Sequence, residues 1–173
     1  RVPFEHPMWV LYSSGTTGRP KGVRFPLAHK PLGEPGLAVE GFRRYGIGEA
    51  TVYLSTAPCY HAAPLQFCMG VHRLGGTAVV MEHFDAEASL AAIERYGVTH
   101  SQWVPTMFVR LFKLPPEVRE RYDLSSHRLA LHAAAPCPVP VKEQIIEWWG
   151  PIVHEYYSST EAIGATAISA EDW

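Results

Sequence analysis

The sequence predicts an α/β domain with a mostly parallel β-sheet flanked by helices. Short apolar, β-prone runs alternate along the chain with segments of helical periodicity, and this alternation is typical of parallel sheets. The 173 residues suffice for one domain or a large piece of one. A composition of 47% hydrophobic and 18% charged residues is that of a folded chain rather than a disordered one.

The expected strands are short apolar runs bounded by turns rich in glycine, proline or small polar residues. They cover residues 8–12, 52–54, 77–81, 99–104, 129–132 and 152–156. The stretch from Gly22 to Phe25 also has an extended pattern. Ligands of parallel α/β sheets bind in the loops beyond the strand ends, so we expect the functional residues there.

Two longer helices carry clear start and stop signals. Asp85 is a good N-cap for a helix that buries Leu90 and Ile93 and ends at Gly97. Pro140 suits the first turn of another, which ends at Gly150 and has apolar residues at helical spacing, namely Val141, Ile145, Trp148 and Trp149. Shorter helices are expected over residues 106–113 and 116–122.

Charge, hydropathy and cysteine use exclude several classes of protein. The net charge of −2 gives no electrostatic reason to expect a nucleic-acid partner. No apolar run approaches the roughly 18 residues of a membrane span, so no integral membrane segment is expected. Cys59, Cys68 and Cys137 form no Cys-x-x-Cys pair, which argues against a zinc ribbon or a disulfide framework. A cytoplasmic location follows as the default expectation.

The most informative stretch is a loop rich in hydroxyl groups and glycine. It contains Ser13, Ser14, Gly15, Thr16, Thr17, Gly18 and Lys21. Backbone N–H groups of such a turn can form an anion-binding nest, hydroxyls can donate into it, and a lysine adds positive charge for a polyphosphate. It is not a Walker loop, because Gly22 follows Lys21 in place of Ser or Thr. Composition alone leaves a solvated hairpin loop as the alternative.

The order of residues is more specific than their composition. Ser-Gly-Thr-Thr-Gly-Arg-Pro-Lys-Gly resembles the phosphate-loop signature of the adenylate-forming superfamily, which includes acyl-CoA synthetases, luciferases and amino-acid adenylation domains. A second stretch, residues 155–161, is similar to the Tyr-Gly-x-Thr-Glu signature of the same superfamily. Tyr157, Thr160 and Glu161 match it, whereas Ser158 and Ala162 replace glycines.

Three intermediate stretches extend the resemblance through nearly the whole chain. Residues 57–61 are similar to a Pro-x-x-His segment that lines the acyl pocket, and residues 103–107 to a Val-Pro-Thr strand-to-helix turn. Residues 132–136 are similar to a small-residue stretch that borders both adenine and the acyl group. Within the superfamily the chain looks most like ligases that act on fatty or other bulky acyl groups.

The resemblance implies an ATP-dependent acyl-CoA ligase, an acid–thiol ligase that uses ATP, Mg²⁺ and CoA. Lys21 and Glu161 are the implied catalytic residues, and Glu161 and Ser13 the implied metal ligands. His61, Trp103 and Met107 would contact the carboxylic acid. The nucleotide would be held by Ser13, Ser14, Gly15, Thr16, Thr17, Gly18, Lys21, Ala134, Ala135, Pro136, Glu155, Tyr156, Tyr157, Ser158 and Thr160.

The resemblance also implies that parts of the enzyme are missing. The chain begins with Arg1, and the family's ribose-binding aspartate and C-terminal lysine domain should follow Glu161. We therefore expect residues 1–173 to be one partial AMP-binding domain, inactive or nearly so in isolation. The alternatives are a non-catalytic nucleotide- or acyl-binding module and an amino-acid adenylation domain. The choice of acid, and that between a monomer and a homo-oligomer, stay open.

Overall fold

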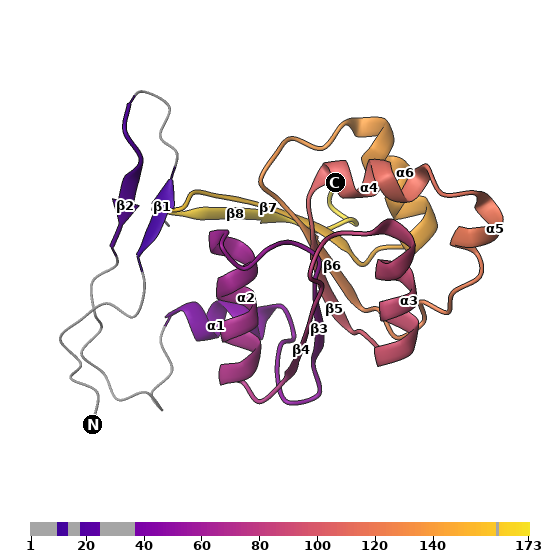
Figure 1. Cartoon of the computed structure of the whole chain (residues 1–173), viewed down its shortest axis with the longest axis horizontal. Helices are drawn as coiled ribbons and strands as arrows, with labels where there is room; N and C mark the ends of the chain where they lie inside the picture. The colour runs from indigo at the N-terminus through magenta and orange to yellow at the C-terminus, as the bar shows by residue number, and fades with distance from the viewer. Residues whose placement is uncertain (1–9, 14–17, 25–36, 162) are drawn as a thin grey trace.

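The computed structural model describes residues 10–13, 18–24, 37–161 and 163–173 (Figure 1). Within this part of the chain six strands form one sheet in the order β4-β3-β5-β6-β7-β8. Its strands are β3 (Val52–Ser55), β4 (Thr77–Val80), β5 (His100–Trp103), β6 (Leu129–His132), β7 (Val153–Ser158) and β8 (Ala165–Ile168). β1 (Leu11–Ser13) and β2 (Lys21–Val23) form a separate antiparallel hairpin.

The sheet is parallel from β4 to β7, and β8 joins it antiparallel to β7. Helices connect the parallel strands and cover both faces (Figure 1). On one face lie α1 (Leu37–Arg44) and α2 (Ala62–Arg73), and on the other α3 (Ala86–Tyr96), α4 (Pro105–Phe112) and α6 (Val139–Trp149), with α5 (Pro116–Arg119) beyond them. This is the mostly parallel α/β fold that the sequence predicts.

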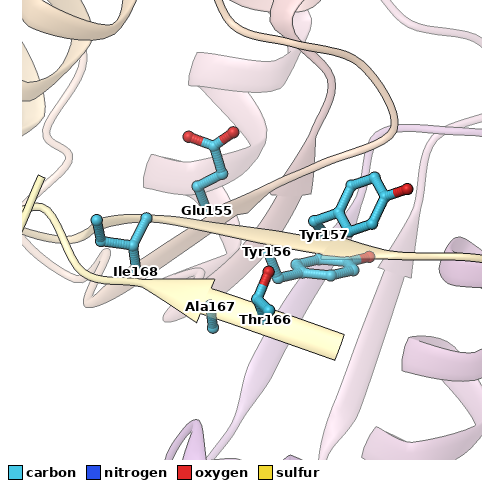
Figure 2. A pocket seen from close by; sticks show the side chains of 6 residues that line it. All are labelled: Glu155, Tyr156, Tyr157, Thr166, Ala167 and Ile168. Carbon is cyan, nitrogen blue, oxygen red and sulfur yellow. The ribbon is translucent and has the colours of Figure 1, made fainter. Parts of the chain in front are cut away.

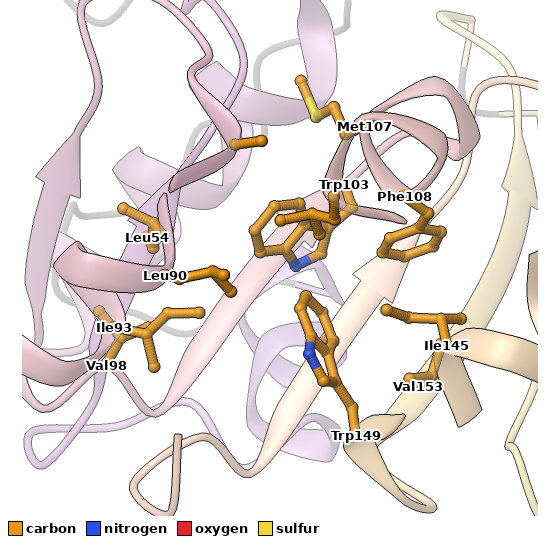
Figure 3. Close-up of a cluster of buried hydrophobic side chains, with 13 residues drawn as sticks. Leu54, Leu90, Ile93, Val98, Trp103, Met107, Phe108, Ile145, Trp149 and Val153 are labelled. Carbon is orange, nitrogen blue, oxygen red and sulfur yellow. The ribbon is translucent and has the colours of Figure 1, made fainter. Parts of the chain in front are cut away.

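Each face of the sheet has its own apolar core, because neighbouring residues of a strand point to opposite faces. Leu54 packs with the helices α3, α4 and α6 in the cluster of Figure 3, which also contains Trp103 and Trp149. Tyr53, the preceding residue, packs instead with Phe67 of α2. The two cores hold the carboxyl ends of β3, β5, β6 and β7 at a common edge.

The helix signals of the sequence are confirmed. The Asp85 side chain accepts a hydrogen bond from the Ala88 N–H at 2.8 Å, and Gly97 ends α3 in the left-handed region at φ 59°. In α6, Ile145 and Trp149 are buried as the periodicity predicts. α4, α5 and α6 begin or end within a few residues of their expected bounds.

Three elements are absent from the prediction, namely α1, α2 and β8. In α2, Pro64 and Gly70 resemble breaks in a helix rather than parts of one. Pro64 lies in the first turn, where its missing N–H costs no helical hydrogen bond. Gly70 is required by packing, because a Cβ there would collide with the ring of Phe42 from α1. In the described part of the chain no helix is long and apolar enough to cross a bilayer.

Candidate functional site

A cavity of about 610 Å³ opens at the carboxyl ends of the parallel strands. Its lining comes from the segments after β3, β6 and β7, from the end of β5 and from the first turns of α2. The chain order changes direction between β3 and β5, since β3 leads to β4 on one side and β5 leads to β6 on the other. Open α/β sheets bind ligands at such a switch point.

The α2 side of the cavity is built from small side chains and one histidine. Ala57, Ala62, Ala63 and Pro64 line it and leave room for a bulky ligand. His61 is exposed at the N-cap of α2, where its side chain makes no capping hydrogen bond, and its ring lies 4.6 Å from that of Tyr60. The imidazole is therefore available to a ligand in the cavity.

The floor of the cavity contains Gln102 and Tyr156, which belong to a chain of neutral hydrogen-bonding groups. The Tyr53 hydroxyl donates to Gln102 Oε1 at 3.2 Å, and Gln102 Nε2 donates to the Tyr156 hydroxyl at 2.5 Å. Burial raises the pKa of Tyr156 to about 12, so its hydroxyl is protonated at neutral pH. The ring of Phe67 lies 6.2 Å from that of Tyr156 and covers it from α2.

The opposite rim consists of the turn after β7 and the segment after β6. Ser158, Ser159, Thr160 and Glu161 line the cavity there, and Ser159 and Glu161 are exposed. Ala134 lies across from them with φ 74°. This left-handed conformation is uncommon for a residue with a Cβ, and such strain is concentrated at binding sites.

A second hollow of about 340 Å³ follows the β7–β8 pair (Figure 2). Glu155, Tyr156 and Tyr157 line it from β7, and Thr166, Ala167 and Ile168 from β8. Glu155 and Tyr157 point to one side of β7 and Tyr156 to the other, as strand alternation requires (Figure 2). Tyr156 lines both hollows, so its strand connects them.

A buried charged cluster lies on the α6 side of β7. Lys142 is 0% exposed; its ammonium lies 2.5 Å from His132 Nε2 and 3.4 Å from Glu155 Oε2. Burial, then the nearby Lys142 ammonium, lowers the pKa of His132 to about 4, and burial also lowers the pKa of Lys142. This cluster was not predicted from the sequence, although Lys142 stands three residues before Ile145 and seven before Trp149, on the buried face of α6.

The cavity brings together several residues that the sequence singles out. His61, Trp103, Ala134, Tyr156, Ser158, Thr160 and Glu161 all line it. Trp103 borders it but is only 1% exposed, and its indole packs against Phe84 and Trp149 in the core. Met107 lies in the same core, where the Thr56 hydroxyl approaches its sulfur at 3.3 Å. Ala135 and Pro136 are exposed in the segment after β6, outside the lining.

The phosphate-loop candidates lie on the β1–β2 hairpin. Ser13 pairs with Lys21 across it, and Lys21 and Gly18 are exposed. None of these three is among the described residues that line the cavity. Ser14, Gly15, Thr16 and Thr17 lie outside the described residues. Over the described ranges there is no group of three or more His, Cys, Asp or Glu residues that could hold a metal ion by itself.

Curated relatives cover almost all of this chain. A probable CoA ligase of Humulus lupulus is 35% identical over 171 residues, which are 96% of this chain and 30% of that protein. A 4-coumarate–CoA ligase-like protein of Arabidopsis thaliana is 33% identical over 178 residues, 99% of this chain and 30% of that protein. The chain thus spans about 30% of the length of these relatives.

Solved structures show the same fold. The O-succinylbenzoate coenzyme A synthetase of Bacillus subtilis in complex with AMP superposes with a TM-score of 0.74 at 30% identity, covering 94% of this chain and 32% of that one. The amide bond synthetase McbA of Marinactinospora thermotolerans gives a TM-score of 0.76 at 27% identity, covering 94% and 31%. The family model described as AMP-binding enzyme matches residues 2–173, and the chain therefore belongs to the AMP-binding enzyme family.

Proposed function

We propose that this chain is the nucleotide- and acid-binding part of an ATP-dependent acyl-CoA ligase. The observation that carries the proposal is the cavity itself. It joins a rim containing Thr160 and the exposed Glu161 to a wall of small apolar side chains beside His61. A site of this form can hold a triphosphate at its mouth and a carboxylic acid behind it. The CoA ligases among the relatives support the same chemistry.

The mouth of the cavity and the adjoining β7–β8 hollow together suit a nucleotide. Ala134 has no bulky side chain to keep a flat base from the backbone, and Tyr157 offers an exposed ring across the β7–β8 hollow. Thr160 can donate a hydrogen bond to a phosphate oxygen. Lys21 and the hydroxyls of residues 13–17 would neutralise and bind the β- and γ-phosphates.

Glu161 fits a magnesium ion that arrives with the nucleotide. Mg²⁺ is usually bound by one or two carboxylates, phosphate oxygens and water, and the exposed Glu161 carboxylate can supply the protein ligand, with Ser13 as a second. The ion would neutralise negative charge on the phosphates. A solved relative in complex with ATP and magnesium supports this assignment.

The chemistry is the conversion of a poor acyl donor into a good one. A carboxylate oxygen attacks the α-phosphorus of ATP, the bond to pyrophosphate breaks, and acyl-AMP forms. The thiolate of CoA, having lost its proton, then attacks the acyl carbon and AMP leaves. The protein positions the reactants and neutralises charge, which are the dominant contributions in phosphoryl transfer.

The acid is a fatty or other bulky carboxylic acid with an uncharged body. Small side chains on the α2 wall leave space for it, and His61 can orient its carboxylate. The described lining has no aspartate that could pair with a substrate ammonium, which disfavours an amino acid. We further propose that the chain acts as one partial domain of a longer enzyme, because the relatives are about three times its length.

The test is pyrophosphate release and acyl-CoA formation by a longer protein that carries this chain. Lys21→Ala and Glu161→Ala should each lower kcat/KM at least 100-fold, because charge neutralisation at the transition state is lost. Lys113→Ala and Glu117→Ala remove the same charges from exposed positions at the C-cap of α4 and in α5, and should leave the rate unchanged. Wild-type rates in both site variants would refute the assignment.

A further inference from the structure

The polar floor of the cavity lies beside a wall of small apolar side chains, namely Ala57, Ala62, Ala63 and Pro64. Gln102 is 6% exposed and Phe67 is 7% exposed, whereas Ser159 and Glu161 at the rim are exposed. The cavity therefore runs from a wet mouth to a dry floor. ATP is large and charged and occupies the mouth under the proposed function, on which this inference rests. The end of the acid farthest from its carboxylate then reaches the floor.

The Tyr156 hydroxyl is held in place but keeps a hydrogen-bonding site. Its side chain is fixed by Gln102 Nε2 and by the ring of Phe67, and Gln102 is fixed in turn by the Tyr53 hydroxyl. A phenol can take part in more than one hydrogen bond, and Gln102 is the one partner that the described residues supply. A half-buried polar group with unused hydrogen-bonding capacity favours a ligand that completes it.

The charges of the side chains around the floor further restrict which chemical groups can bind there. The ionisable side chains of the described lining are His61, Tyr156 and Glu161, and no lysine or arginine is among them. Tyr156 is neutral at physiological pH, as a phenol ordinarily is, and burial raises its pKa further, to about 12. A second carboxylate or an ammonium at the far end of the acid would thus be buried without a counter-ion, which is costly. An uncharged hydroxyl or carbonyl group could instead form a hydrogen bond with the Tyr156 hydroxyl.

We propose that Tyr156, positioned by Gln102, is a specificity-determining residue that selects acids bearing a hydroxyl or carbonyl group at the end remote from the reacting carboxylate. An acid that ends in a methyl or phenyl group leaves the Tyr156 hydroxyl without a second partner, and such sites discriminate against analogues that lack the polar group. Because Tyr156 would contact the acid at the floor and not the nucleotide at the mouth, the affinity for ATP should not depend on Tyr156.

The experiment measures kcat/KM for acyl-CoA formation by the longer enzyme with matched pairs of acids. Octanoic acid is compared with 8-hydroxyoctanoic acid, and 3-phenylpropanoic acid with its 4-hydroxy derivative. The wild-type enzyme should favour the hydroxylated member of at least one pair by about 10-fold, the value of roughly one hydrogen bond in a dry site. Tyr156→Phe keeps the ring and should abolish most of that preference without changing the KM for ATP.

Two further variants test the positioning role of Gln102 and provide a control. Gln102→Leu removes the group that positions Tyr156 and should lower the preference in the same direction. Tyr96→Phe removes a phenol from the outer surface of α3, where Tyr96 is 47% exposed, and should leave the preference unchanged. Thermal unfolding checks that each variant is folded.

The outcomes separate this inference from the proposed function. If the wild-type enzyme forms no thioester with any acid, the proposed function falls and the inference falls with it. If thioesters form but the wild-type enzyme shows no preference, or the preference of Tyr156→Phe stays within about 2-fold of the wild-type value, only the inference falls. A larger loss in Tyr156→Phe, with none in Tyr96→Phe, supports it.

Discussion

Two consecutive residues of β7 enter two very different environments. Glu155 points toward α6 and meets the buried Lys142 ammonium and the His132 ring. Tyr156 points toward α2 and meets Gln102 and Phe67, which carry no charge. The two clusters lie on opposite faces of the same sheet, at the same edge. One strand thus supplies a charged support on one side and a neutral ligand floor on the other.

The two clusters differ in how much of their surface a ligand can contact, and we therefore expect them to have different roles. The charged cluster is mostly closed: Lys142 and His132 are 0% exposed, and only Glu155, whose side chain is 29% exposed, borders the β7–β8 hollow. It fixes the end of β7 next to Ala133 and Ala134, but it offers a ligand little contact surface. The neutral cluster lines the cavity directly. Perturbing the first should therefore change stability, and perturbing the second should change selectivity.

The largest effect is expected from Glu155→Leu, which leaves the Lys142 ammonium buried without a carboxylate. Breaking a buried ion pair on one side costs about 3–5 kcal/mol, and the partial exposure of Glu155 favours the lower end, about 3 kcal/mol. The double variant Glu155→Leu with Lys142→Met should recover most of this loss. The measurement is the free energy of unfolding in urea.

Glu143→Leu provides the matched control. It removes a carboxylate from an exposed position of the same helix as Lys142 and should change the free energy of unfolding by no more than about 0.5 kcal/mol. An equal loss for Glu143→Leu and Glu155→Leu would show that the buried cluster contributes nothing special to stability.

The next effect is a loss of stability in mild acid that belongs to the charged cluster. The folded pKa of His132 is about 4, below its value of about 6.5 in the unfolded chain, so the unfolded state takes up the proton first as pH falls. Stability from this group is complete above pH 6.5 and is lost through the window down to pH 4. Between pH 6.5 and 5 the loss is about 1.6 kcal/mol. The groups that face His132 are Lys142, Glu155 and the Phe108 ring.

The slope should flatten in His132→Gln, measured as the free energy of unfolding at several pH values. His127, whose pKa is lowered to about 3 mainly by burial, contributes a similar slope that persists in this variant. The difference between the two curves isolates His132. Parallel curves for the wild-type protein and His132→Gln would contradict the prediction.

Much of this architecture could be predicted because local signals and tertiary packing agree. The cap at Asp85, the left-handed Gly97 and the apolar spacing of α6 all act within a few residues, so the sequence alone reveals them. α2 could not be recognised in this way. Gly70 weakens the helix locally and is explained only by the approach of Phe42 from another helix.

The candidate site likewise contains some residues that could be predicted from the sequence and others that could not. Motif resemblance placed His61, Ala134, Thr160 and Glu161 in one site, and the fold brings these four to one cavity. It could not distinguish Glu155 from Tyr156, because a linear motif does not state which face of a strand each residue occupies. Lys142 escaped notice because a lysine is normally exposed, and only its contacts with His132 and Glu155 explain its burial.

The smallest expected effect concerns the neutral cluster around Tyr156. Tyr53→Phe removes one hydrogen bond, from the Tyr53 hydroxyl to Gln102, and keeps the ring that stacks on Phe67. The free energy of unfolding should fall by about 1 kcal/mol. Burial raises the pKa of Tyr53 and of Tyr156, so nothing in this cluster titrates between pH 5 and 8 and the loss should be the same across that range. If the loss of stability caused by Tyr53→Phe grew as the pH fell, the neutral cluster would be coupled to the charged cluster on the other face of β7. The assignment of separate roles to the two clusters would then be wrong.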